Sequence, residues 1–162
     1  MPVRIANWYS CACASFTADR LPDGTPTGWY VPEAAHPYNT FIKSGAQIDL
    51  GSLSGGPCPV DKSSIEQFAN DEESVAFYKD STIQSKLNSS LNIMKLSFNE
   101  YDAVFFVGGH GPLVDFASST ELPKRLVSYW SQGGIISAVC HGPACLLKME
   151  LEGMHVSVHG YQ

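Results

Sequence analysis

Two short runs of apolar residues, AVFFV at 103–107 and IISAV at 135–139, constrain the fold more than any other feature of the chain. Uniformly apolar strands of this length are typical of parallel sheets that are buried on both faces. A helix is expected over 121–131, between the two runs. The three segments therefore predict a βαβ unit with a right-handed crossover, within a mostly parallel sheet covered by helices.

The remaining segments also alternate between strand-like and helix-like patterns. Further strands are expected over residues 3–9, 46–53 and 154–158. Further helices are expected over 32–43, in two or three short pieces within 64–98, and over 142–149. Pro32 suits the first turn of its helix and Gly45 suits the stop. The segments 17–28 and 54–64 are rich in turn-forming residues and predict loops.

The size and charge of the chain limit what it can be. With 162 residues, 44% hydrophobic and 16% charged, the sequence predicts a single domain over 1–162 with one well-buried core. Ten Lys and Arg against sixteen Asp and Glu, with no basic stripe, argue against nucleic acid as a partner. No segment approaches the about 18 apolar residues of a membrane helix, so no membrane partner is expected.

The first residues and the cysteines favour a cytoplasmic protein. The segment MPVRIANWYSCACASF is a poor signal peptide, because Asn7 and Ser10 interrupt its short apolar stretch. The chain has five cysteines, an odd number, without the paired spacing or density of a disulfide scaffold. A reducing cytosol therefore fits the sequence best.

The chemistry is expected just after the two apolar strands, because sites in open parallel sheets form at the carboxyl ends of the strands. GGHGP follows the first run and CHGPA follows the second. In the second motif, Cys140 follows the strand directly, Gly142 comes two residues later, and a new helix begins there. This arrangement has the form of a nucleophile elbow. The partial positive charge at the start of that helix is expected to favour the thiolate of Cys140. A buried structural cysteine is the alternative, and the two glycine-rich motifs together favour a reactive thiol.

Several residues near Cys140 are candidates for the same site. Gly108 and Gly109 allow close approach of the backbone, and the N–H groups of Gly109 and His141 are expected to form an oxyanion hole. His141 is a candidate general base or acid if its ring turns back toward the thiol, and His110 is a second candidate. An ordinary tight turn and a solvated histidine are the alternatives. Pattern alone explains Glu33 as an acid favoured by the helix dipole.

No metal or cofactor is expected. The residues considered as possible metal ligands are Cys11, Cys13, His155 and His159. Their spacing matches no zinc module.

Four segments resemble the ThiJ/PfpI superfamily, which is related to class I glutamine amidotransferases, and within it the fungal heat-shock-type glutathione-independent glyoxalases. These segments are TGWYVPEAAHPYNTFIKSGAQIDLGS, GGPCPVDKSS, YDAVFFVGGHGPLVDF and GGIISAVCHGPACLL. They follow the family order over most of 24–149, and the joint occurrence of PEAAHP, GGHG and AVCHGP is far more specific than any one motif. The resemblance implies a flavodoxin-like sandwich in which Cys140 is the nucleophile, His141 its neighbour, and Glu33 reaches the thiol from the first helix.

The activity implied by this resemblance is conversion of methylglyoxal, a small dicarbonyl substrate, to lactate without glutathione or metal. Cys140 would attack the aldehyde to form a hemithioacetal, and the backbone would hold the oxyanion. Glu33 and His141 would then move a proton between adjacent carbons through an enediol.

The sequence departs from the family pattern at both ends. RIANWYSCACASF replaces a smooth aliphatic first strand, and LEGMHVSVHGYQ resembles the point where relatives enter another hairpin. We therefore expect C-terminal elements to be missing, including an acid that orients the active-site histidine. Uncovered apolar faces would favour a homo-oligomer, such as a dimer, and turnover would be reduced. A stress-induced holdase chaperone, a redox-sensing protein and an inactive truncated relative are the alternative functions.

Overall fold

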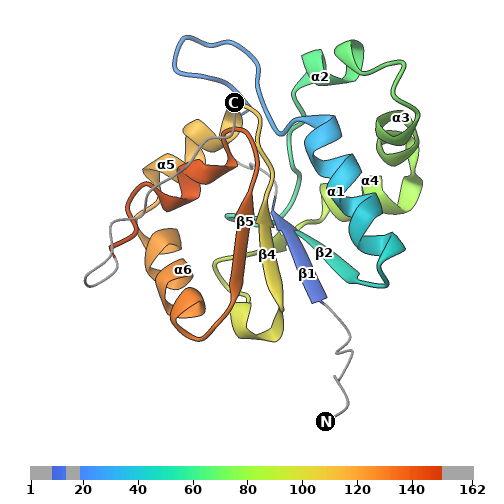
Figure 1. The fold of residues 1–162 in the computed structure, drawn as a ribbon. Coiled ribbons are helices and arrows are strands. Elements are labelled where there is room, and N and C mark those ends of the chain that lie inside the picture. The colour runs from blue at the N-terminus through green and yellow to red at the C-terminus, as the bar shows by residue number, and fades with distance from the viewer. Residues whose placement is uncertain (1–8, 14–18, 151–162) are drawn as a thin grey trace.

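The computed structural model describes residues 9–13 and 19–150, with side chains from residue 19 onward. Its five strands form one parallel sheet in the order β3-β2-β1-β4-β5 (Figure 1). The strands are β1 (Tyr9–Cys13), β2 (Gln47–Ser52), β3 (Leu91–Asn92), β4 (Ala103–Phe106) and β5 (Ile135–Ala138). The predicted parallel α/β sheet is confirmed.

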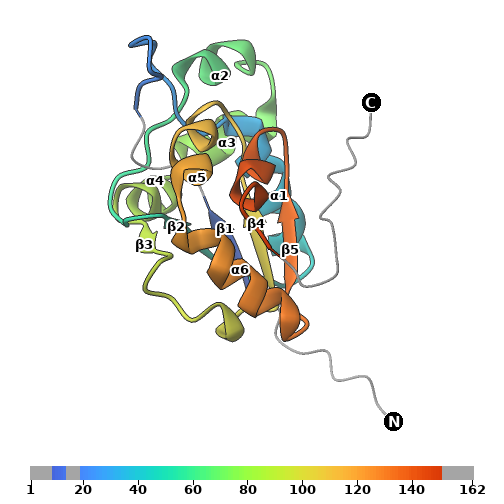
Figure 2. The ribbon, with the colours of Figure 1, turned by 90° about the vertical axis from the view of Figure 1, so that its left-hand side faces the viewer.

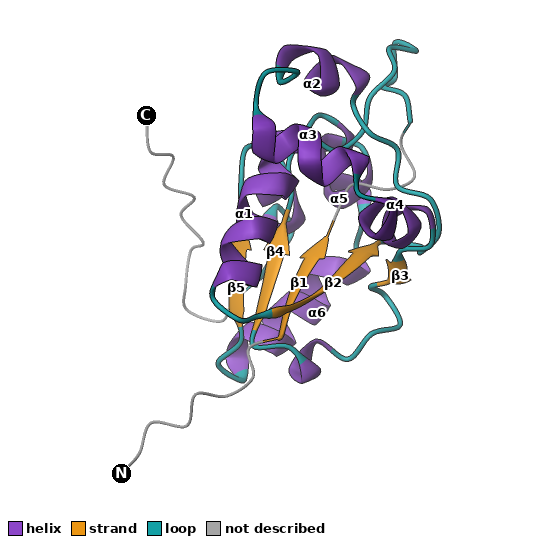
Figure 3. Ribbon diagram, turned by 90° about the vertical axis from the view of Figure 1, so that its right-hand side faces the viewer, coloured by secondary structure: helices purple, strands orange, loops and turns teal. Residues whose placement is uncertain are grey.

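Helices cover both faces of this sheet. The α-helices are α1 (Val31–Lys43), α2 (Lys62–Gln67), α3 (Glu72–Lys79), α4 (Ser81–Asn88), α5 (Asp115–Ser118) and α6 (Glu121–Ser131). The 3-10 helices are η1 (Phe98–Glu100), η2 (Gly111–Leu113) and η3 (Gly142–Leu146). Figures 2 and 3 show α5 and α6 on one side of the sheet and α1, α3 and α4 on the other. The result is the three-layer sandwich expected of a flavodoxin-like fold.

The central strand β4 connects two hydrophobic cores. Phe105 and the following Val107 pack in the core beside α1, α3 and α4, whereas Val104 and Phe106 pack in the core beside α5 and α6. This division follows from the alternation of side chains along a strand. All four side chains are buried, so the predicted burial on both faces is confirmed for this run.

Strand β5 differs from that prediction. It pairs in parallel with β4, as expected, and Ile136 and Ala138 pack on the core beside α6. Ile135, however, is 48% exposed, and Ser137 is also exposed. Among the described residues, β5 pairs with β4 alone and forms the edge of the sheet. The prediction that IISAV is buried on both faces is therefore wrong for the described structure.

Helix α1 carries Glu33 and agrees closely with the predicted 32–43. It begins at Val31, and Pro32 lies in the first turn, where its missing N–H would be unpaired in any residue. Gly45, with φ 87°, follows the last turn and takes the left-handed conformation that ends helices. Glu33 therefore lies in the first turn, at the end of α1 nearest the carboxyl ends of the strands.

Three other boundaries differ from the sequence predictions. The first described strand is Tyr9–Cys13, which continues past the predicted end at residue 9; residues 3–8 of that prediction lie outside the described residues. Pairing with β2 and β4 outweighs its weak local propensity. The loop predicted over 54–64 ends at Asp61, because its carboxylate accepts a hydrogen bond from the Ser63 N–H (2.9 Å) and caps α2.

After the elbow, the predicted helix 142–149 is only the short 3-10 helix η3, Gly142–Leu146. The strand predicted over 154–158 lies outside the described residues. The polar stretch 64–98 does contain the short helices that were expected, together with the two-residue strand β3, which was not expected.

Candidate active site

Cys140 lies on a sharp turn between β5 and η3, as the nucleophile elbow predicts. Its φ of 54° is in the left-handed region, which non-glycine residues rarely adopt and which costs about 1–3 kcal/mol. The Gly142 N–H donates to the Val139 carbonyl (2.8 Å) and closes the turn. A Cβ on Gly142 would collide with the Phe106 carbonyl, so this glycine lets the turn pack against β4.

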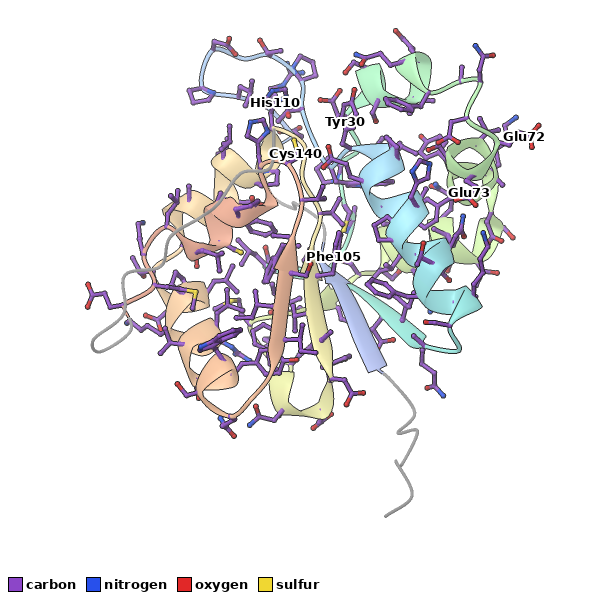
Figure 4. All side chains as sticks on the ribbon, in the orientation of Figure 1. Tyr30, Glu72, Glu73, Phe105, His110 and Cys140 are labelled. Atoms are coloured by element: carbon purple, nitrogen blue, oxygen red, sulfur yellow. The ribbon has the colours of Figure 1, made fainter. Side chains whose placement is uncertain are left out.

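The two histidines of the glycine-rich motifs meet beside this thiol. His141 Nδ1 lies 3.4 Å from Cys140 Sγ, so the ring does turn back toward the thiol. The His110 ring lies beside the His141 ring, with ring centroids 5.0 Å apart and planes inclined by 35°. Figure 4 shows His110 and Cys140 together at the carboxyl end of the strands.

Glu33 approaches the same thiol from α1. A Cβ on Gly108 would collide with Glu33 Oε2 and would lie 2.7 Å from Cys140 Cβ. The absence of a side chain at Gly108 therefore allows the carboxyl group and the elbow to share this space. Glu33 Oε2 is buried and has no hydrogen-bond partner of good geometry among the described residues. It is thus available to a proton or to a ligand.

Burial raises the pKa of the Glu33 carboxyl group above its ordinary value. The Cys140 thiol and the Gly108 N–H, as hydrogen-bond donors, and the charges of His141 and His110 act in the opposite direction. A carboxyl group with a raised pKa is a stronger base once it is ionised. Glu33 therefore has the surroundings of a proton-transferring group.

The pKa of the Cys140 thiol is also raised, which corrects the expectation that the elbow favours the thiolate. The side chain as a whole is exposed, but loss of hydration around its sulfur is the main cause. The negative charge of Glu33 and the hydrogen bond that the thiol donates to it add to this effect. The N–H groups of Gly109 and His141 lower the pKa but do not outweigh these causes, and η3 is a short 3-10 turn rather than a full helix.

The sequence predicts that those two N–H groups form an oxyanion hole. Both groups lower the pKa of the Cys140 thiol as hydrogen-bond donors. Gly109 has φ 99°, and a Cβ at this residue would collide with the Gly28 carbonyl. Only glycine fits at this position of the turn.

Tyr30 is a neighbour of the site that the sequence did not indicate. It precedes α1, and its N–H donates to the Gly108 carbonyl (3.3 Å). Burial raises the pKa of its phenol, and the negative charges of Asp61, Glu33 and Cys140 raise it further. Its place one turn before Glu33 is the one sequence signal that could have identified it.

The other described cysteines have different surroundings. Burial raises the pKa of Cys58, and it raises the pKa of the fully buried Cys145 to about 12. The thiols of Cys58, Cys140 and Cys145 are all free. Of these three, Cys140 alone is exposed and lies beside a carboxyl group and an imidazole.

Within residues 19–150, no three or more histidine, cysteine or acidic side chains are grouped closely enough to hold a metal ion. The side chains of Cys11, Cys13, His155 and His159 lie outside the described residues. No helix in the described part of the chain has the length and apolar character needed to cross a bilayer.

The fold and the elbow define an α/β protein with a flavodoxin-like sheet and a cysteine at the nucleophile position. A family model described as ThiJ/PfpI family-like matches residues 25–157. The chain belongs to this family, as its motifs predict.

Relatives of established name support the resemblance to the fungal glyoxalases. The chain is 36% identical to "Glyoxalase 3" of Candida albicans over 137 residues, which are 82% of this chain and 57% of that protein. It is 34% identical to "Glutathione-independent glyoxalase HSP31" of Saccharomyces cerevisiae, over 82% of this chain and 56% of that protein. The chain thus spans somewhat over half the length of these two relatives.

Solved structures agree with the fold. The crystal structure of glyoxalase III from Candida albicans superposes with a TM-score of 0.71 at 33% identity, over 85% of this chain and 59% of that one. Rapid Encystment Protein 24 KDa of Francisella tularensis superposes with a TM-score of 0.80 at 27% identity, over 92% of this chain and 66% of that one.

Proposed function

We propose that this chain acts as a glutathione-independent glyoxalase that converts methylglyoxal to lactate, with Cys140 as the nucleophile. The observation that carries the proposal is that Glu33, Gly108 and Cys140 meet at one point. Glu33 lies in α1, whereas Gly108 follows β4 and Cys140 follows β5. The names of the fungal relatives support the same reaction.

In the first step, the Cys140 sulfur forms a bond to the aldehyde carbon and the thiol proton passes to the neighbouring Glu33 carboxylate. The carbonyl π electrons move to oxygen, and the N–H groups of Gly109 and His141 stabilise the oxyanion. Protonation of this oxygen gives the hemithioacetal.

In the second step, Glu33 or His141 removes the hydrogen of the former aldehyde carbon as a proton. The electron pair left behind forms a C=C bond to the neighbouring carbon, whose carbonyl oxygen takes a proton to give the enediol. The hydroxyl group on the first carbon then loses its proton as its C=O bond forms, and the second carbon takes a proton. The first carbon is oxidised and the second is reduced, so no external oxidant or reductant is needed. Water cleaves the resulting lactoyl thioester, and this releases lactate and the thiol.

Several further properties are part of the proposal. The substrate is a small dicarbonyl, and the chain uses no cofactor or metal. Residues 1–162 form a single domain, since both cores share β4. We also propose that the protein acts in the cytoplasm and as a homo-oligomer. Exposed Ile135 at the edge of the sheet supports association.

The test is whether the purified chain forms lactate from methylglyoxal without glutathione and in the presence of a metal chelator. We expect turnover in the unaltered chain and none above background in Cys140→Ala. Circular dichroism of both proteins shows whether the variant folds. A folded, unaltered chain that forms no lactate under these conditions would overturn the proposal.

A holdase chaperone is the second candidate, and exposed apolar side chains favour it. Leu147 is 68% exposed, Ile135 48% and Trp130 47%. Holdase action depends on such surface rather than on a thiol. In an aggregation assay with a heat-denatured client protein, Cys140→Ala would therefore retain full suppression if this function operates.

A further inference from the structure

The backbone of Tyr30 lies directly beside the turn that supports the nucleophile. Its N–H donates to the Gly108 carbonyl, and a Cβ built on Gly109 would lie 3.0 Å from the Tyr30 nitrogen. Gly108 in turn lies against Cys140 Cβ. A single glycine turn therefore separates the start of α1 from the elbow.

Two neighbours at the end of α2 hold the Tyr30 side chain. Its hydroxyl donates to Gln67 Oε1 (2.6 Å), and its ring meets Phe68 edge-to-face, with centroids 5.8 Å apart. A hydrogen bond at one end and a ring contact along the edge restrict both side-chain torsions of a tyrosine. The ring is thus a fixed surface rather than a freely rotating group.

The Tyr30 side chain lies near the reacting groups, on the α1 side of the site. The charges of Glu33 and Cys140 both raise the pKa of the Tyr30 phenol, so its hydroxyl lies within electrostatic range of the base and the nucleophile. Figure 4 shows Tyr30, Cys140 and His110 at the same end of the sheet, with Tyr30 on the α1 side.

We propose that Tyr30, held by Gln67 and Phe68, forms the wall of the site on the α1–α2 side and limits the size of the electrophile that reaches Cys140. The inference rests on the proposed function in taking Cys140 as the nucleophile. A rigid ring beside the thiol leaves room for the methyl group of methylglyoxal and hinders an aldehyde that carries a larger substituent. Tyr30 is then a specificity-determining residue, and the bulk of its ring matters rather than its hydroxyl.

Alkylation of Cys140 measures this size limit without requiring turnover. Iodoacetamide and iodoacetanilide share one reactive carbon, from which the thiolate displaces iodide, but the second carries a phenyl group. Mass spectrometry of the Cys140 peptide gives the two rates. We expect Tyr30→Ala to raise the rate with iodoacetanilide relative to iodoacetamide about tenfold, within the range typical of pocket discrimination. Tyr30→Phe keeps the ring, so its ratio is expected to stay close to that of the unaltered chain.

Tyr38→Ala is the matched control, because Tyr38 lies within α1, about two turns after Tyr30, and packs against Phe77. In Tyr38→Ala, the ratio of the iodoacetanilide rate to the iodoacetamide rate is expected not to change. Tyr30→Leu replaces Tyr30→Ala if the alanine variant does not fold, and the same rise is expected. An unchanged ratio in a folded small variant, or an equal rise in Tyr30→Phe, would overturn the proposal.

The relative kcat/KM for methylglyoxal and phenylglyoxal supplies a second measurement, and Tyr30→Ala is expected to shift it toward phenylglyoxal. A chain that is alkylated with the expected size dependence but forms no lactate would refute the glyoxalase proposal and still support the proposed role of Tyr30 as the wall of the site. A chain that forms lactate but whose alkylation shows no size dependence would support the glyoxalase proposal and overturn the proposed role of Tyr30.

Discussion

Glu33 Oε2 and Cys140 Cβ converge on the space beside Gly108 in which any larger residue would place its Cβ. The two residues perturb each other: the thiol lowers the pKa of the carboxyl group, and the carboxylate raises the pKa of the thiol. The same contact therefore provides a base and makes the resting thiol less acidic.

Glu33→Gln is expected to change turnover and thiol reactivity in opposite directions. Loss of the proton-transferring group is expected to lower kcat by about 100- to 10,000-fold. Loss of the negative charge lowers the pKa of Cys140, so alkylation by iodoacetamide at neutral pH becomes faster. Lactate assays and mass spectrometry of the Cys140 peptide measure the two effects.

Glu72→Gln is the control for this substitution, since Glu72 also lies in the first turn of a helix but is exposed on α3. Neither turnover nor the rate of Cys140 alkylation is expected to change in Glu72→Gln. Retained turnover in Glu33→Gln would reduce Glu33 to a helix-terminal acid, and slower alkylation would contradict the electrostatic argument.

The alkylation of Cys140 is expected to accelerate as the pH rises, with a midpoint above that of an ordinary thiol. The sign follows from the raised pKa: below it the neutral thiol predominates, and the reactive thiolate accumulates only as the pH approaches it. Cys140 is still expected to react before the half-buried Cys58 and the buried Cys145, whose pKa is about 12. Faster reaction of Cys11, Cys13 or Cys58 would contradict the assignment of Cys140 as the reactive thiol.

Gly108→Ala is expected to abolish most turnover while the protein still folds. The new methyl group would lie 2.7 Å from Cys140 Cβ and would collide with Glu33 Oε2, so one or both groups must move. Displacement of about 1 Å in a reacting group lowers the rate by roughly 100-fold. Gly45→Ala is the contrast: it strains a φ of 87° but meets no atom within 4 Å, so it should cost some stability and leave kcat unchanged.

Arg125→Met is expected to destabilise the fold without altering the candidate active site. The guanidinium group donates to the Met94 and Leu96 carbonyls and lies 5.0 Å from the Phe98 ring centroid. Loss of these bonds leaves two carbonyls unpaired and is expected to cost about 1–3 kcal/mol in urea denaturation. Lys124→Met removes an exposed ion pair with Glu121 and should cost about 0.5 kcal/mol or less. Equal costs for the two variants would contradict the structural role of Arg125.

The elements predicted from the sequence are those whose pattern is local. The run AVFFV is apolar at every position, so it predicts a strand buried on both faces, and β4 is such a strand. Pro32 and Gly45 mark the ends of α1 because each restricts or frees its own backbone. The elbow at Cys140 was recognisable because strand, nucleophile and glycine occur in one short motif.

The position of Glu33 against Gly108, the wall formed by Tyr30 and the raised pKa of Cys140 depend instead on the tertiary structure. Each arises where β4, β5 and α1 meet, and that meeting depends on the order of strands in the sheet. The exposure of Ile135 likewise depends on which elements lie beside β5. The sequence by itself therefore determined strand β4, the first helix and the turn that carries Cys140, the proposed nucleophile, since neighbouring residues set local conformation. The tertiary structure alone decided the charges and surfaces around that nucleophile, because desolvation and electrostatic interaction depend on distances between segments far apart in the chain.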